Sequence, residues 1–491
     1  MTAKATFLAF DLGAESGRAV LGAFDGERLE LSEVHRFPNG PVRVLDSMHW
    51  DVLRLFQEMK AGLARVAGQE LAGIGVDTWG VDSALLDAQG ALVCTPFHYR
   101  DPRTQGMFEQ VFQRVPREEI FERTGIQFME INTLFQLYAL AQQHPQILAA
   151  ADTLLMVPDL FNYWLSGQKV CEFTEATTSQ MYDPRAGDWA RPLLERLGLP
   201  TRILAPVVQP GTLLGPLLPA IREEVGLKAD VPVIAPPCHD TGSAVVAVPA
   251  SSPDYVYISS GTWSLFGVEV TSPVITPVTL EHNFTNEGGV AGTFRLLKNL
   301  VGLWLVQECR REWQRQGDDL SYDEITRLAA EATPFASLLD PDDPSFLLVG
   351  GMPGRIQAYC RQTGQPVPET KGAIVRCALE SLALRYRAAL KQLEEIVGHR
   401  LGAIHIVGGG GKNALLNQFT ADATNRPVYA GPVEATATGN IIVQAVARGY
   451  LKSVQEGRDL LRRTCDLQVY EPKDTARWDD AYGRFQALRR R

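Results

Sequence analysis

Short apolar runs that end in clusters of Gly, Asp, Ser and Thr constrain the fold of this chain most strongly. They lie at residues 7–10, 74–76, 231–235, 255–258 and 404–407. Each run predicts a buried β-strand whose carboxyl end opens into a polar loop. Binding sites of α/β sheets are usually built at such strand ends. The pattern therefore predicts an α/β fold with its chemistry gathered at the ends of strands.

Helical patterns fill the stretches between these runs. Residues 50–66, 300–313 and 373–396 carry apolar side chains at three- and four-residue spacing. Asp51 stands where a helix would begin, and Gly398 follows the last of these patterns. Both are typical signals of helix ends.

The two halves of the chain begin alike. Residues 7–24 and residues 255–268 each read as an apolar strand, a sharp glycine turn and a second strand. Proline and glycine thicken around residues 206–216 and 249–253, as in a connector. With 491 residues the chain is long enough for two or three domains. We predict two related domains, residues 1–247 and residues 248–491.

Composition narrows the possible partners and the compartment. The net charge of −10 disfavours non-specific binding to nucleic acid, which depends on Lys and Arg. The 7 cysteines form no Cys-x-x-Cys pair, which fits a reducing cytoplasm rather than a disulfide scaffold or a zinc site. There is no apolar run long enough for a membrane span. We expect a cytoplasmic protein, and a monomer, because no exposed apolar stripe is evident.

The first motif with chemical potential is the stretch DLGAESGR, residues 11–18. Gly13 and Gly17 allow the close backbone approach that a phosphate-binding hairpin needs. Arg18 offers donors to phosphate, and Asp11 is a candidate Mg²⁺ ligand. An ordinary tight hairpin, in which Asp11 bonds its own turn, explains the same residues.

Asp240 lies between a predicted strand and a run of small residues that favours a helix. A carboxylate at such a turn can cap the helix, or it can act as a general base in phosphoryl transfer. Position alone favours capping. Asp77 and Asp82 flank the turn Trp79–Gly80, and we expect them to bond locally to that turn.

Two glycine-containing turns occur in the second half. The stretch SSGTWS, residues 259–264, is either a phosphate-facing hairpin or a hydroxyl-rich β-turn. Four glycines, residues 408–411, stand between a predicted strand and a helical pattern that starts at Ala414. They allow a flat ring or a phosphate to pack against bare backbone, or they form a flexible turn.

Together these stretches resemble the FGGY family of sugar kinases. The resemblance rests on DLGAESGR (11–18), GVDTWGVD (75–82), HDTGSAV (239–245), SSGTWSL (259–265), TNEGG (285–289), HIVGGGGKN (405–413) and AGPVEATATGN (430–440), among others. Each motif is weak, but their order and spacing extend over nearly the whole chain. Within the family, the His-Asp-Thr setting of residues 239–241 is similar to the branch that phosphorylates L-rhamnulose.

The resemblance implies two ribonuclease-H-like domains, as in actin and hexokinase, flanking a cleft, with ATP mainly on the second and the sugar mainly on the first. It implies Asp240 as catalytic base and Asp11 near Mg²⁺. The implied ATP contacts are Ala14, Glu15, Ser16, Gly17, Arg18, Thr262, Gln307 and Gly409. The implied sugar contacts are Gly80, His239, Asp240, Thr241 and Asn299.

Some residues depart from the family pattern. Glu15 stands where Ser or Thr is common, so we expect its side chain to face solvent and only its backbone to meet phosphate. Cys360 and Cys377 keep a spacing that permits pairing, but we expect free thiols.

The implied function is ATP-dependent phosphorylation of L-rhamnulose to L-rhamnulose 1-phosphate in L-rhamnose catabolism. A kinase for another ketose or polyol, such as L-fuculose or xylulose, is the alternative. A catalytically inactive protein that binds ATP or sugar is a further one.

Overall fold

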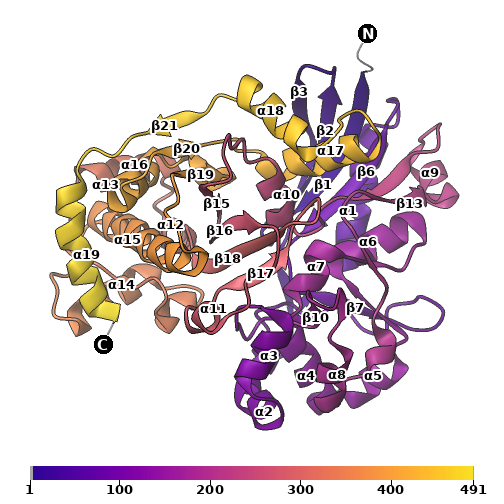
Figure 1. The fold of residues 1–491 in the computed structure, drawn as a ribbon, viewed down its shortest axis with the longest axis horizontal. Coiled ribbons are helices and arrows are strands. Elements are labelled where there is room, and N and C mark those ends of the chain that lie inside the picture. The colour runs from indigo at the N-terminus through magenta and orange to yellow at the C-terminus, as the bar shows by residue number, and fades with distance from the viewer. Residues whose placement is uncertain (1–3, 490–491) are drawn as a thin grey trace. The chain divides into compact units, whose positions relative to one another are not determined.

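The computed structural model describes residues 4–489, which form two compact units (Figure 1). The first unit extends to Pro249 and also contains Glu269–Leu296 and Ala435–Thr464. The second contains Ala250–Val268, Leu297–Glu434 and the chain from Cys465 onward. Compact packing thus groups two later segments with the first unit. The division of the sequence after residue 247 stays a prediction.

The first unit is built on a six-stranded sheet. Its parallel strands β1, β6 and β14 stand side by side, and antiparallel strands β2 and β13 flank them. All three parallel strands were predicted from the sequence. The strand order is β13 (Thr212–Pro216), β14 (Pro232–Ala235), β6 (Gly73–Thr78), β1 (Ala5–Leu12), β2 (Ser16–Phe24) and β3 (Leu29–Pro38).

Helices cover this sheet. The predicted helix at residues 50–66 is α1 (Val52–Arg65), whose N-cap Asp51 accepts the backbone N–H of Arg54 at 3.1 Å. Helix α17 (Ala435–Ala447) packs against β1 and β6 and against α10 (Asp240–Val246) (Figure 1). A Cβ at Gly439 would lie 1.8 Å from the carbonyl oxygen of Ser243, so glycine is required where these two helices cross.

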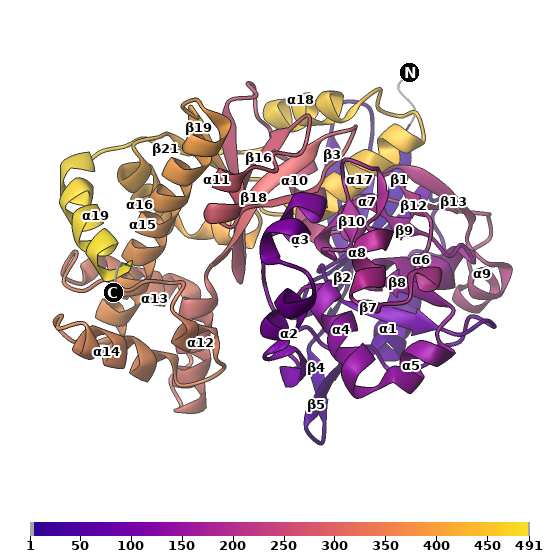
Figure 2. The same ribbon diagram turned by 60° about the horizontal axis from the view of Figure 1, so that its bottom comes forward.

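The rest of the first unit consists of shorter elements, among which the hairpin of β4 and β5 extends away from the others (Figure 2). They are β4 (Pro41–Val44), β5 (Ser47–Trp50), β7 (Ser83–Leu86), α2 (Met107–Arg114), α3 (Arg117–Thr124), α4 (Thr133–Gln143), α5 (Pro145–Ala150), β8 (Thr153–Met156), α6 (Val157–Ser166), β9 (Cys171–Glu172), α7 (Phe173–Thr178), β10 (Tyr182–Asp183), β11 (Asp188–Trp189), α8 (Arg191–Arg196), β12 (Val207–Val208), α9 (Pro219–Val225), α11 (Pro277–Glu281), β17 (Thr285–Gly288) and α18 (Val454–Thr464).

The second unit repeats the arrangement. Strands β15 and β16 are antiparallel, whereas β15, β19 and β20 are parallel. The sheet has seven strands, in the order β17 (Thr285–Gly288), β18 (Phe294–Val301), β16 (Trp263–Val270), β15 (Tyr255–Ser260), β19 (Ala403–Val407), β20 (Val428–Ala430) and β21 (Gln468–Tyr470). The similar openings that the sequence predicted for the two halves are therefore matching strand–turn–strand hairpins.

A long central helix, α15 (Lys371–Val397), organises the helical part of the second unit. Helices α13 (Tyr322–Glu331), α16 (Ala414–Thr424) and α19 (Thr475–Arg489) pack around it (Figure 1). Gly398 ends it in a left-handed conformation, at φ +77°, as the sequence predicted. The remaining helices are α12 (Trp304–Arg315) and α14 (Met352–Gln362).

The predicted helix at residues 300–313 begins too early. Strand β18 extends to Val301, and α12 starts only at Trp304. The apolar residues 300–306 suit a buried strand end and a helix face equally, so periodicity did not separate the two.

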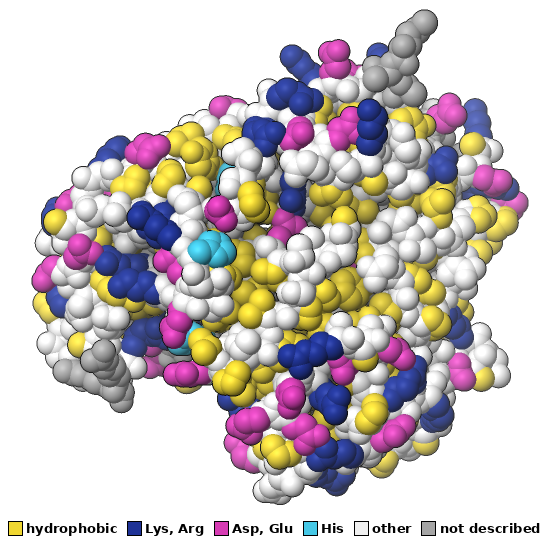
Figure 3. All heavy atoms as spheres, in the orientation of Figure 1, with side chains coloured by type: hydrophobic (Ala, Val, Ile, Leu, Met, Phe, Trp, Pro, Cys, Tyr) yellow, Lys and Arg dark blue, Asp and Glu magenta, His cyan; other side chains and the backbone are white. Residues whose placement is uncertain are grey.

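The surface of the described residues is mixed in charge. Figure 3 shows Lys and Arg side chains interspersed with Asp and Glu over the face drawn. Within residues 4–489, no helix combines the length and the apolar character needed to cross a membrane.

Candidate active site

Carboxylates follow neighbouring parallel strands of the first sheet. Asp11 in β1 and Asp77 in β6 are paired in the parallel register. Asp240 begins α10, after the loop that leaves β14, and His239 in that loop forms a bridge with Thr78. The carboxyl ends of parallel strands meet at one edge of a sheet, so the three acids gather there.

Asp11 is held by Arg18 across the β1–β2 hairpin. Nε and one terminal nitrogen of Arg18 donate to Asp11 Oδ2 at 3.0 and 2.7 Å. The backbone N–H of Gly13 donates to the carbonyl of Ser16 at 2.9 Å and closes the turn. A Cβ at Gly17 would lie 2.2 Å from the ring of Phe37, so only glycine fits there without a shift of that ring.

The rest of the hairpin is open to solvent to different degrees. Glu15 is exposed, which confirms the expected orientation of its side chain. Ala14 and Ser16 are half-buried. The hairpin thus presents backbone and small side chains beside one ion pair.

Asp77 does not bond to its own turn, so that expectation was wrong. It is fully buried, and its Oδ2 accepts the side-chain amide of Asn440 in α17 at 2.6 Å. Gln444, one helical turn later, donates to Asn440 Oδ1 at 2.7 Å. Burial raises the pKa of Asp77 well above its usual range, and the charges of Asp11 and Asp240 add to this effect.

Asp240 occupies the first position of α10 rather than the N-cap. The N-cap residue is His239, and its side chain makes no capping hydrogen bond. Asp240 Oδ1 accepts the backbone N–H of Thr241 at 2.6 Å, and the side chain keeps 31% exposure. Desolvation raises the pKa of Asp240, partly offset by His239. The carboxylate is therefore accessible and more basic than an ordinary Asp.

His239 is surrounded by charged and polar groups of the first unit. Its Nε2 lies 3.5 Å from Asp240 Oδ1, and its Nδ1 lies 3.2 Å from Glu287 Oε2 and from a terminal nitrogen of Arg295. A Cβ at Gly80 would lie 3.3 Å from His239 Nε2. Gly80, His239 and Asp240, all predicted sugar contacts, are thus brought together.

Buried carboxyl groups lie next to the loop that precedes Asp240. Glu172 Oε2 accepts the backbone N–H of Cys238 at 2.9 Å, and burial raises the Glu172 pKa to about 7. Both side-chain oxygens of Glu175 are buried without a hydrogen-bond partner among residues 4–489. Burial, with Asp159 and Glu172 nearby, raises the Glu175 pKa well above its usual range.

The turn that carries Gly80 rests on an aromatic and polar cluster. Asp82 Oδ2 accepts the indole N–H groups of Trp50 and Trp79 at 2.5 and 3.0 Å, and the two indole rings lie 3.9 Å apart. The bond from Trp79 is the local one expected for Asp82. Burial raises the Asp82 pKa to about 6.

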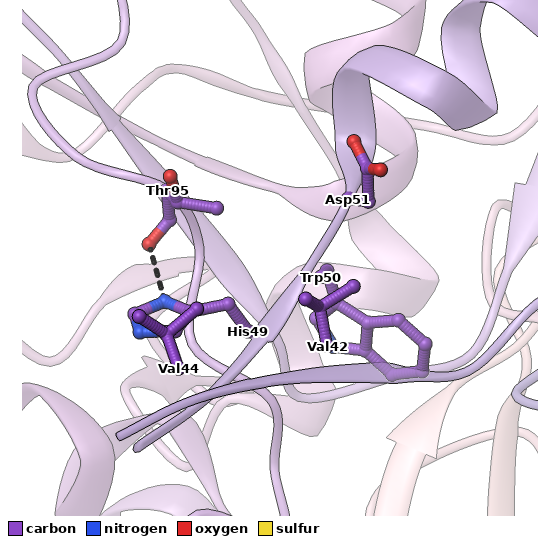
Figure 4. Close-up of a pocket in the computed structure, with 6 residues that line it drawn as sticks. All are labelled: Val42, Val44, His49, Trp50, Asp51 and Thr95. Carbon is purple, nitrogen blue, oxygen red and sulfur yellow. Dashed lines mark hydrogen bonds between the residues drawn. The ribbon is translucent and has the colours of Figure 1, made fainter. Parts of the chain in front are cut away.

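A hollow of about 240 Å³ opens beside Trp50 (Figure 4). None of its lining residues is a predicted site residue. A dashed line in Figure 4 marks the hydrogen bond between the His49 ring and the Thr95 carbonyl, at 3.2 Å. The lining residues are Val42, Val44, His49, Trp50, Asp51 and Thr95.

In the second unit, Thr262 and Gln307 belong to one local structure. The carbonyl of Thr262 accepts the backbone N–H groups of Gly302 and Trp304 at 3.1 and 3.2 Å. The β15–β16 turn therefore fixes the start of α12, the helix that carries Gln307.

Gly409 follows β19, where the glycine stretch passes the end of β15. A Cβ at Gly410 would lie 2.0 Å from Ser260 Oγ, whereas a Cβ at Gly409 would meet no atom within 4 Å. Gly409 thus faces open space. Asn299 lies in β18 beside Lys298, whose pKa burial lowers to about 7.

The structure therefore brings together two separate sets of predicted residues. Asp11, the first hairpin, Gly80 and residues 239–241 belong to the first unit, and Thr262, Gln307, Gly409 and Asn299 belong to the second. Asp77, Glu287 and Arg295 were not predicted as site residues from the sequence. A charged residue within an apolar strand was the available signal for Asp77 and Arg295, and the TNEGG stretch for Glu287.

Known proteins resemble this chain along nearly its whole length. Residues 6–247 match the N-terminal domain, and residues 256–448 the C-terminal domain, of the FGGY family of carbohydrate kinases. A protein named rhamnulokinase from Bacteroides thetaiotaomicron is 47% identical over 98% of this chain and 99% of its own length. A rhamnulokinase from Halalkalibacterium halodurans is 42% identical over 95% of this chain and 99% of its own length. A rhamnulokinase from Bacillus subtilis is 38% identical over 96% of this chain and 96% of its own length.

Solved structures agree in fold. Gluconate kinase from Lactobacillus acidophilus superposes with a TM-score of 0.81 at 16% identity, over 99% of this chain and 98% of its own. Xylulose kinase from Rhodospirillum rubrum gives 0.79 at 21% identity, over 98% of each chain. These likenesses confirm the predicted α/β fold of two actin/hexokinase-type domains. The chain belongs to the FGGY family of carbohydrate kinases.

Proposed function

We propose that this protein is an ATP-dependent kinase that phosphorylates L-rhamnulose on its 1-hydroxyl, with Asp240 as general base. The observation that carries the proposal is the environment of Asp240. Its carboxylate is accessible, it stands at the start of a helix beside His239 and Gly80, and desolvation raises its pKa. Relatives named rhamnulokinase, 38–47% identical over nearly the full chain, support the sugar.

In this proposal Asp240 accepts the proton of the sugar's primary hydroxyl as that oxygen bonds to the γ-phosphorus. The bond from the γ-phosphorus to the β–γ bridging oxygen breaks, and ADP leaves. A general base works best when its pKa approaches the working pH, and the raised pKa of Asp240 moves it in that direction. The hydrogen bond from the Thr241 N–H holds one carboxylate oxygen in place. The other oxygen remains for the substrate.

The first hairpin suits a phosphate and its metal. ATP supplies the phosphoryl group, and Mg²⁺ neutralises charge on its phosphates. Mg²⁺ commonly binds through one or two carboxylates plus phosphates and keeps several waters. Asp11 fits this role because its carboxylate lies near the end of β1, beside the hairpin, where Arg18 donates to Oδ2.

The remaining assignments follow the same division. We propose that the backbone of the first hairpin and Arg18 bind phosphate oxygens, and that Gly409, whose Cα faces open space, receives the flat base. The other proposed ATP contacts are Ala14, Glu15, Ser16, Gly17, Thr262 and Gln307, and the proposed sugar contacts are Gly80, His239, Asp240, Thr241 and Asn299.

A coupled assay of ADP release with L-rhamnulose tests the proposal. L-Rhamnulose should give the highest kcat/KM in a panel with L-fuculose, xylulose and glycerol, and ³¹P NMR should show a 1-phosphate. A higher kcat/KM for another ketose would identify that ketose as the substrate and would leave the proposed phosphoryl transfer unchanged. Tight ATP binding without ADP release for any sugar would favour the inactive binding protein.

We further propose that the enzyme acts as a monomer in the cytoplasm. The 7 cysteines are all free thiols, as expected for a reducing compartment. Analytical ultracentrifugation should give a single species near 54.0 kDa. A dimer at micromolar concentration would contradict the first part, and recovery of the protein outside the cytoplasmic fraction would contradict the second.

A further inference from the structure

The contacts of the His239 ring distinguish its two nitrogens. Nδ1 faces a terminal nitrogen of Arg295 at 3.2 Å, in hydrogen-bonding geometry. Arg295 is fully buried, and its Nε donates to the carbonyl of Gly288 at 2.8 Å. An arginine carries only donors, so the nitrogen that faces it must supply a lone pair. This places the acceptor on Nδ1.

The opposite edge of the ring agrees with this assignment. Nε2 lies 3.5 Å from the carboxylate oxygen Oδ1 of Asp240 and faces the backbone of Gly80. An N–H group directed at a carboxylate is attractive, whereas a lone pair directed there is repulsive. With the proton on Nε2 the contacts with Arg295 and Asp240 are both favourable, and with the proton on Nδ1 both are unfavourable.

Glu287 offers the competing arrangement. Its Oε2 lies 3.2 Å from His239 Nδ1 and also 3.2 Å from Arg295. A proton on Nδ1 would satisfy Glu287 but would set two N–H donors against each other at 3.2 Å. The ion pair between Glu287 and Arg295 instead compensates both buried charges and leaves Nδ1 to accept.

We propose that Arg295 is a positioning residue that holds His239 as the neutral Nε2–H tautomer. His239 then donates a hydrogen bond to an oxygen of the sugar beside the reacting hydroxyl, and Asp240 remains the base for that hydroxyl. Arg295 is fully buried and acts through His239 in this proposal. The assignment of the sugar as acceptor rests on the proposed function, whereas the tautomer does not.

Nitrogen-15 NMR of the unliganded protein tests the tautomer directly. With labelled histidine, and His239→Gln to identify the signals, His239 should show an unprotonated Nδ1 and a protonated Nε2 at pH 7.5. A protonated Nδ1, in either the neutral ring or the imidazolium, would overturn the proposal. Because no substrate is present, this result is independent of whether L-rhamnulose is the true sugar.

Variants test the consequence for the reaction. The double variant Arg295→Met/Glu287→Gln removes the donor without leaving a buried charge, and its new amide oxygen can accept from Nδ1–H. We expect the tautomer to switch and the sugar KM to rise about tenfold, the scale of one hydrogen bond, with the ATP KM unchanged. Unchanged sugar KM with a switched tautomer would refute the donor role of His239.

Two further variants keep the test decisive if the double variant does not fold. Arg295→Lys retains a buried cation and a donor, so it should keep the Nε2–H tautomer and most of the sugar affinity. Loss of that tautomer in the folded Lys variant would contradict the proposal. Arg327→Met, at a side chain that is 62% exposed, is the matched control and should behave as the wild type.

Discussion

Six strands of the two large sheets follow the same order, but the chemistry at their strand ends differs. In the first unit β3, β2, β1, β6, β14 and β13 follow one another, and in the second β18, β16, β15, β19, β20 and β21 do. In both, the first parallel strand turns through a glycine hairpin into its antiparallel neighbour. The repeat lies in the topology of the fold and not in its functional groups.

The first unit places charges at these ends. Asp11 and Asp77 lie near the ends of β1 and β6, and Asp240 lies after β14. Arg18 forms an ion pair with Asp11. The second unit places hydroxyl groups and bare backbone at the corresponding positions, at Ser260 and along the glycines that follow β19. One copy of the topology thus carries charged side chains, and the other allows close approach to its backbone.

The largest effect should come from the charge on which the proposed chemistry depends. Asp240→Asn should lower kcat by at least about 10²-fold, the lower end expected when a general base is lost, while ATP binding survives. Asp230→Asn, at a side chain that is 71% exposed, serves as the matched control. Near-normal turnover of the Asp240→Asn variant would show that Asp240 is not the general base.

The pH profile sharpens the same assignment. Asp240 must be ionised to accept a proton, so kcat/KM should fall as the pH drops through its pKa. Because desolvation raises that pKa, the acid limb should lie above the ordinary Asp value of about 3.9. An acid limb at or below that value would contradict the role of Asp240 as general base.

A smaller effect is expected at the first hairpin. Asp11→Ala should raise the Mg²⁺ concentration needed for half-maximal rate by about tenfold, the scale seen when support of a metal site is lost. Arg18→Met keeps the carboxylate and should raise the ATP KM instead. An unchanged Mg²⁺ titration in the Asp11 variant would count against its role.

In the second unit we expect substitutions to act through steric clashes rather than through loss of charge. Gly410→Ala puts a methyl group 2.0 Å from Ser260 Oγ and should cost about 1–3 kcal/mol of stability, as overpacking does. Gly409→Ala meets no atom within 4 Å, so it should fold normally and weaken only ATP binding. Equal stability of the two variants in thermal unfolding would break this distinction.

The smallest effect should be on the stability of the first unit, at the buried carboxyl group of Glu175. Burial raises the pKa of Glu175 in the folded protein above its unfolded value of about 4.3. The folded protein is therefore most stable with respect to this group below about pH 4.3, where Glu175 is protonated in both states. Stability is lost as the pH rises from there toward the folded pKa. Glu175→Gln removes this loss. The Tm should exceed that of the wild type by about 2–4 °C at pH 8, with little gain at pH 4. A lower Tm at pH 8 would mean that the carboxylate is paired.

The sequence alone predicted much of the fold for a simple reason. Buried parallel strands are continuous apolar runs, so β1, β6, β14, β15 and β19 were visible as such. Helices α1 and α15 carried their own end signals in Asp51 and Gly398. The start of α12 was misplaced because its first turn continues the apolar strand β18.

The sequence by itself determined the strands, the two glycine hairpins and the residues expected at strand ends, because these depend on local patterns. Only the tertiary structure decided which partners they have. Asp77 bonds to Asn440, 363 residues away, and Arg295 reaches His239 across 56 residues. Such pairs form where separate strands and helices meet, and no periodicity along the chain encodes that meeting.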